Sequence, residues 1–166
     1  IVSLTAAAAS AGMRVLLLGG DGGSADAARL ELVRRGAAIE QLAAIELPNP
    51  MSFESAFLAQ LASDVETAKA DVVFVSLGSE KGERLISSAR HALPKACWLN
   101  VGAAFDFLAG RVERAPGHVQ DAGLEWLHRL TREPGRLAKR YLVDDGPFAL
   151  GMLARSAARR RAGGVR

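Results

Sequence analysis

The sequence contains very little cysteine, since Cys97 is the only one among its 166 residues. A single cysteine excludes both an internal disulfide framework and a zinc site built from several cysteines. The three histidines, His91, His118 and His128, lack the spacing of metal ligands. We therefore expect no metal site. Because Cys97 falls within an apolar run, we expect it to lie in the core.

Long apolar runs are also absent. No stretch approaches the roughly 20 consecutive apolar residues that a membrane-spanning helix needs. Residues 1–12 are small and apolar but lack a basic leading region, so they are not typical of a signal peptide. Because the chain starts at Ile1 and soon enters a helix-like run, we expect an amino-terminal piece to be missing. The 49% of apolar residues excludes a disordered chain.

Charge is unevenly distributed along the chain. Residues 1–110 contain 9 Lys and Arg against 12 Asp and Glu, whereas residues 111–166 contain 12 against 6. We therefore divide the chain into a mildly acidic domain, 1–110, and a basic appendage, 111–166. A basic segment can bind anionic lipid surfaces, phosphates or nucleic acid, or be simply solvated. Nucleic acid is disfavoured, because no aromatic residues are interleaved with the charges and no known module is present.

Short apolar runs alternate with helix-like segments in the first domain. Strands are predicted at 14–18, around 38–43, at 71–77 and at 97–101. Helices are predicted at 3–11, from Ser24 as N-cap to Arg35, from Ser52 as N-cap to Lys69, and at 81–91. This alternation predicts an α/β fold, a Rossmann-like parallel sheet with helices on both faces. After Gly102 we expect only short helices, which form a helical C-terminal appendage.

Three glycine-containing loops follow predicted strands, at 19–23, 78–81 and 102–106. In an open parallel sheet, ligands bind at the carboxyl ends of strands, where helix N-termini present free N–H groups. The loops therefore predict one crevice for a phosphate-bearing ligand. The first loop also matches the dinucleotide pattern G-x-G-x-x-(G/A), with Glu40 near the position of an NAD-ribose acid. An NAD-binding or other nucleotide-binding module is therefore the alternative, although Asp21 within the turn would repel a pyrophosphate.

The second and third loops resemble motifs of a known family. Residues 78–83 are similar to the G-S-P-K-Q-E motif of the WecG/TagA/CpsF glycosyltransferases. Residues 102–110 resemble that family's G-(G/A)-x-F-D-F-x-x-G segment, and residues 111–116 resemble its R-A-P continuation. Residues 123–130 resemble G-L-E-W-L-Y-R-L. Because these motifs occur in the same order over roughly 70 residues, the resemblance is stronger than any single motif.

This sequence departs from the family pattern at a few positions. Glu80 and Gly82 stand where G-S-P-K-Q-E has proline and glutamine, so the second loop lacks a rigid turn and a hydrogen-bonding amide. Lys139 stands where the family usually has arginine, which alone offers a bidentate fork to phosphate. The resemblance further implies that the general base lies in an amino-terminal third outside this chain. A non-catalytic fragment is therefore a second alternative.

The resemblance implies a bacterial enzyme of cell-surface polysaccharide biosynthesis that needs no cofactor. It would transfer a hexosyl unit, of the N-acetylmannosamine or uronic-acid type, from a UDP-sugar to a polyprenyl-diphosphate-linked sugar. Its implied location is cytoplasmic, with peripheral attachment to the anionic inner face of the plasma membrane. Homo-oligomer formation is left open.

The resemblance and the loops together assign candidate site residues. The appendage cations expected to support catalysis are Arg129, Arg136 and Lys139. The residues expected to bind substrate are Gly20, Gly78, Ser79, Lys81, Glu83, Gly102, Phe105, Asp106, Arg111 and Arg114. Structural interpretations remain open for several of them: Ser79 and Asp106 can cap helices, and the two arginines can be solvated.

Overall fold

The computed structural model describes residues 1–20, 22–48, 50–112 and 116–124, together with residues 127, 130, 131, 135 and 152. The chain forms two compact units, Ile1–Glu113 and Arg114–Arg166. The elements of the first unit are α1 (Val2–Ser10), β1 (Val15–Gly19), α2 (Ser24–Arg34), η1 (Ile39–Gln41), β2 (Leu42–Ile45), α3 (Ser55–Ala68), β3 (Val72–Ser76), α4 (Ser79–Ala89), η2 (Arg90–Ala92), β4 (Cys97–Asn100) and α5 (Ala104–Leu108). Helix α6 (Gly117–Asp121) belongs to the second unit.

The strands of the first unit form one parallel sheet in the order β2-β1-β3-β4. Val15 of β1 lies level with Leu42 of β2 and with Val72 of β3, which in turn lies level with Cys97 of β4. Every residue of β1 and β3 is buried, because these two strands occupy the centre of the sheet. The predicted α/β fold with a parallel sheet is confirmed.

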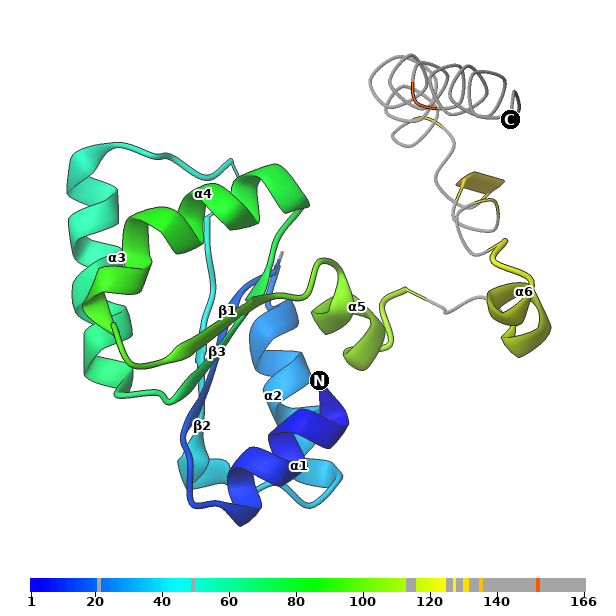
Figure 1. Ribbon diagram of the computed structural model, residues 1–166, viewed down its shortest axis with the longest axis horizontal. Coiled ribbons are helices and arrows are strands. Elements are labelled where there is room, and N and C mark those ends of the chain that lie inside the picture. Colours follow the sequence, from blue (N-terminus) through cyan, green and yellow to red (C-terminus); the bar gives the residue numbers. More distant parts are fainter. Residues whose placement is uncertain are drawn as a thin grey trace, which may run out of the picture. The chain divides into compact units, whose positions relative to one another are not determined.

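Helices cover both faces of the sheet (Figure 1). Successive strand residues point to opposite faces, so Val15 and Leu17 pack against α1, α2 and α5, whereas Leu16 and Leu18 pack against α3 and α4. A strand between two helical layers must be apolar on both sides, which explains the continuous apolar run of β1.

The helix starts differ from the predicted ones. Gly23, with a φ of 86°, is the N-cap of α2, and Ser24 is instead the first helical residue and is fully buried. Helix α3 begins at Ser55 with Glu54 at the N-cap, while the Ser52 hydroxyl accepts a hydrogen bond from the Glu54 N–H at 3.1 Å. The predicted capping roles of Ser24 and Ser52 are therefore wrong. Helix α2 therefore starts one residue earlier than the predicted cap implies, and α3 starts two residues later.

Two strand predictions also need correction. The strand predicted around residues 38–43 begins only at Leu42, because the preceding residues form the 3-10 helix η1. Cys97 is exposed, so its predicted place in the core is wrong. It lies at the start of β4, an edge strand of the sheet, whose first and last residues are exposed.

Candidate functional site

The carboxyl ends of β1, β3 and β4 lie at one edge of the sheet, and each predicted loop follows one of these strands. From β1 the chain continues through α2 to the neighbouring β2, and from β3 it continues through α4 to β4 on the other side. The point where these directions diverge lies between β1 and β3. Ligands of open α/β sheets bind outside this point, at the carboxyl edge.

Ser76, the last residue of β3, connects the first and third loops. Its backbone carbonyl accepts a hydrogen bond from the Gly20 N–H at 2.9 Å, and its hydroxyl donates to the Gly102 carbonyl at 2.5 Å. Ser76 is one of the few buried polar residues in the described part of the chain. Sequence reasoning missed it, although a serine that ends an otherwise apolar strand was the available signal.

The first loop follows β1 and turns sharply into α2. Gly20 has a φ of 85°, and a Cβ atom at this position would overlap the hydroxyl of the buried Ser24. Gly20 is therefore required by the turn itself. Its predicted contact with a ligand stays a prediction.

The start of α2 already holds a carboxylate. Glu46, directly after β2, accepts a hydrogen bond from the Asp26 N–H at 3.0 Å through Oε1. Glu40, the acid suggested by the dinucleotide pattern, lies in η1 before β2 and thus at the opposite edge of the sheet from Gly20. A pyrophosphate at the start of α2 would meet the negative charge of Glu46, so this arrangement disfavours dinucleotide binding at the first loop.

The second loop leads from β3 into α4, which begins two residues earlier than predicted. Gly78 is the N-cap and makes no side-chain capping bond, so the interpretation of Ser79 as a cap is wrong. The first N–H bonded within α4 is that of Gly82, which donates to the Gly78 carbonyl at 2.8 Å. The earlier N–H groups of the helix thus have no acceptor inside it. Lys81 and Glu83 are exposed.

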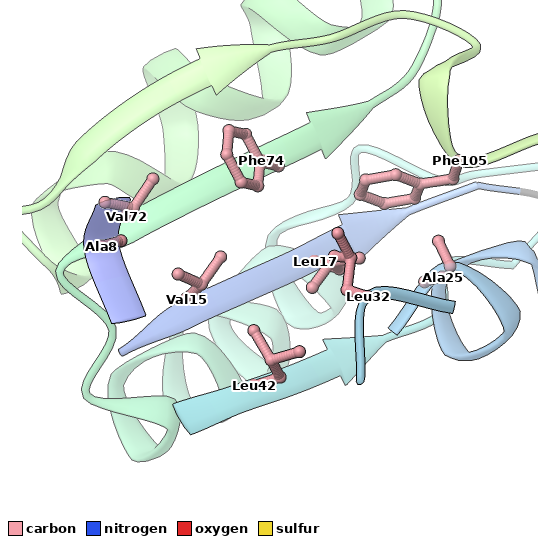
Figure 2. Close-up of a cluster of buried hydrophobic side chains, with 10 residues drawn as sticks. Ala8, Val15, Leu17, Ala25, Leu32, Leu42, Val72, Phe74 and Phe105 are labelled. Atoms are coloured by element: carbon pink, nitrogen blue, oxygen red, sulfur yellow. The ribbon is translucent and has the colours of Figure 1, made fainter. Parts of the chain in front are cut away.

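The third loop carries α5. The Phe105 side chain is fully buried among Leu17, Phe74 and other residues of the core, and Figure 2 shows its ring beside Leu17. Any contact of this residue with a ligand would therefore involve its backbone. Asp106 is half-buried and lies inside α5, whose N-cap is Ala103, so Asp106 does not cap this helix.

Arg111 connects the third loop to the first. The backbone turns after Gly110, and the Arg111 N–H donates to the Asp106 carbonyl at 2.9 Å. Its guanidinium then donates through Nη2 to the Gly22 carbonyl at 2.6 Å. The structure thus brings together Gly20, Gly102, Asp106 and Arg111 at the carboxyl edge, with the start of α4 following β3 at the same edge.

The family model of the glycosyl transferase WecG/TagA/CpsF family matches residues 1–162. The chain belongs to this family. WecG/TagA/CpsF proteins are glycosyltransferases of cell-surface polysaccharide synthesis, and they use a nucleotide-sugar donor and an acceptor substrate. In this WecG/TagA/CpsF glycosyltransferase, the loops that follow β3 and β4 are those whose sequences resemble the family motifs.

Several predicted site residues of this glycosyltransferase lie outside the described residues: Arg114, Arg129, Arg136 and Lys139. Within the described ranges, no three His, Cys, Asp or Glu residues are grouped as a metal site would require. No helix in these ranges has both the length and the apolar character needed to cross a membrane. The roles of the four cations stay predictions.

Proposed function

We propose that this glycosyltransferase transfers a hexosyl unit, of the N-acetylmannosamine or uronic-acid type, from a UDP-sugar to a polyprenyl-diphosphate-linked sugar. The observation that carries this proposal is the gathering of the glycine loops at one edge of the sheet, where Ser76 joins two of them. The N–H groups at the start of α4 and in the Gly102 turn would bind the diphosphate, because a helix N-terminus attracts anions. The start of α2 is less suited, since Glu46 already occupies it.

Lys81 supports a phosphate at the start of α4. It lies in the first turn of the helix, where the helix dipole disfavours a cation. Its side chain is exposed and forms no ion pair within the described part of the chain. A bound diphosphate would offset the unfavourable position of this ammonium group.

The basic appendage would complete the reaction. Arg129, Arg136 and Lys139 would stabilise the negative charge that develops on the UDP leaving group. We assign the general base, which removes the proton from the acceptor hydroxyl, to no residue of this chain. No resident cofactor is needed for this transfer.

We also propose that the enzyme works in the cytoplasm, on the anionic inner face of the plasma membrane. Residues 111–166 contain 12 Lys and Arg against 6 Asp and Glu, and Leu124, Leu127 and Met152 are exposed. Basic and apolar side chains together bind anionic bilayers. The chain should float with phosphatidylglycerol vesicles, less so as salt increases, and not with phosphatidylcholine vesicles. Equal flotation with both would contradict this proposal.

Calorimetric titration of the chain with UDP, and separately with NAD, tests the nucleotide assignment. We expect saturable UDP binding that Lys81→Ala weakens about tenfold, as loss of a charged hydrogen bond would. The matched control is Lys95→Ala, because Lys95 is also exposed but precedes β4 and so lies at the opposite edge. Removing Lys81 should not lower the unfolding temperature, since the helix dipole disfavours it. NAD binding without UDP binding would overturn the proposal.

A further inference from the structure

The second loop lacks the glutamine of the G-S-P-K-Q-E motif, and Gly82 takes its place. Gly82 is buried in the first turns of α4, although its neighbours in sequence are exposed. A Cβ atom on Gly82 would lie 2.6 Å from Cγ and 2.8 Å from Oδ1 of Asn100. These distances are shorter than real Cβ contacts, so any side chain at position 82 would overlap the amide of Asn100. The volume beside α4 that a residue 82 side chain would occupy is therefore filled by that amide.

Asn100 is the last residue of β4 and thus lies at the carboxyl edge of the sheet. Its Oδ1 accepts a long hydrogen bond from the Gly102 N–H, at 3.4 Å, so the oxygen faces the third loop. The amide nitrogen is the atom nearest to the position that a Cβ atom on Gly82 would take. Asn100 is exposed, and within the described ranges its amide nitrogen donates to no protein group. The side chain therefore stands between the second and third loops, with an N–H donor for which the described residues supply no acceptor.

We propose that Asn100 supplies the amide donor that the family motif carries at position 82, and that its Nδ2 donates to a phosphate oxygen of the nucleotide diphosphate. This inference rests on the proposed function. A neutral amide suits this place, because it adds a donor beside the free N–H groups of α4 without adding another charge next to Lys81. In this chain the amide would come from the end of β4 and not from α4, and the absence of a side chain on Gly82 leaves space for it.

Three variants of the full chain test the proposal, with UDP as the probe in calorimetry and with the unfolding temperature as a second readout. Asn100→Asp keeps the shape but replaces the N–H donor with a carboxylate, so UDP binding should weaken by more than about tenfold at nearly unchanged stability. Gly82→Gln alone should lower the unfolding temperature, because its side chain overlaps Asn100. Gly82→Gln with Asn100→Gly should return UDP affinity to within about threefold of the wild type, a rescue that a merely structural role of Asn100 does not predict.

The outcomes separate this inference from the proposed function. A wild-type chain that binds no UDP would overturn both. A wild-type chain that binds UDP, with unchanged affinity in Asn100→Asp, would overturn the role of Asn100 and leave the proposed function standing. A folded double variant that binds as weakly as Asn100→Asp would show that residue 82 does not substitute for Asn100. If the double variant fails to fold, Asn100→Ala decides instead, because it removes the amide donor without adding the negative charge by which aspartate repels a diphosphate. Unchanged UDP affinity in that variant would overturn the role of Asn100, and a loss of about tenfold would support it.

Discussion

Replacing Phe105 with alanine would remove a ring that the structure places wholly inside the core of the first unit. Phe105 is fully buried and belongs to the cluster that contains Leu17, Leu32 and Phe74 (Figure 2). Phenylalanine-to-alanine changes in such positions cost about 3–5 kcal/mol, because transfer free energy is lost and a cavity remains. A domain is stabilised by only about 5–15 kcal/mol in total. Phe105→Ala should therefore remove a large part of the stability of the first unit.

The assay is urea denaturation followed by far-ultraviolet circular dichroism, combined with UDP titration. Phe105→Leu is the control, because it keeps an apolar side chain of similar volume and should cost less than about 1.5 kcal/mol. For a chain of this length, 1 kcal/mol corresponds to roughly 2–4 °C in the unfolding temperature. We therefore expect a loss of about 10 °C for Phe105→Ala and of at most a few degrees for Phe105→Leu.

UDP affinity distinguishes a core residue from a ligand-binding one. If the ring of Phe105 only anchors α5, Phe105→Leu should bind UDP within about twofold of the wild type, because its backbone and helix remain in place. A tenfold loss of UDP affinity in Phe105→Leu at unchanged stability would refute this reasoning. It would show that the ring reaches the nucleotide, as the resemblance to the family motif had implied.

Arg111→Lys keeps the charge but loses the planar guanidinium that donates to the Gly22 carbonyl. UDP titration should therefore show a several-fold loss of affinity in Arg111→Lys, as in Arg111→Ala. Full UDP affinity in Arg111→Lys would mean that the charge alone matters. Lys69 ends α3 with a φ of 49°, so Lys69→Gly should raise the free energy of unfolding by about 1 kcal/mol in urea titration, whereas Lys69→Ala should give no gain. The hydrogen bond from Arg35 lowers the pKa of Glu31 in the folded chain. The stability that this ion pair contributes is therefore present above the ordinary glutamate pKa, and it is lost as the pH falls through the lowered pKa of Glu31. The difference in unfolding temperature between the wild type and Glu31→Gln should therefore shrink between about pH 6 and pH 3, and a constant difference would contradict the role of this ion pair.

The sheet could be predicted from the sequence because its two central strands are apolar on both sides. A run such as Val15–Gly19 has no polar residue to expose, so only a buried strand or buried helix fits it, and its length favours a strand. Helix starts were less predictable. Ser24 is a good N-cap in isolation, but its side chain is buried behind Gly20, and the left-handed backbone of Gly23 begins the helix instead.

The candidate site was predicted at the level of loops but not at the level of contacts. Loops that follow parallel strands must meet at one edge, so the topology alone gathers residues such as Gly78 and Gly102. The connections between them depend on pairs that are far apart in sequence. Ser76 and Gly102 are separated by 26 residues, and Asp26 and Glu46 by 20. No local pattern predicts such pairs. The contact between the Asn100 amide and Gly82 could not be predicted for the same reason.

The exposed Cys97 shows another limit of local patterns. Its neighbours are apolar, and a buried position was therefore expected. Exposure depends on whether another strand lies alongside, which only the order of the whole sheet determines. The positions of Glu40 and Glu46 also depend on the observed bounds of β2. These bounds place Glu46, and not Glu40, at the carboxyl edge of the sheet beside the glycine turn.

The hydrogen bond between Arg111 and Gly22 spans 89 residues of the chain. At a synthesis rate of roughly 5–20 residues per second, the ribosome adds the guanidinium on the order of 10 s after the glycine turn. β1 is made before that interval and the other strands of the described sheet within it, since β4 ends at Asn100. A nascent chain can therefore pair its sheet before its first and third loops are joined. The contact between the first and third loops is thus among the last of the first unit to form during translation, and mutations of Arg111 should impair the proposed ligand binding before they impair folding.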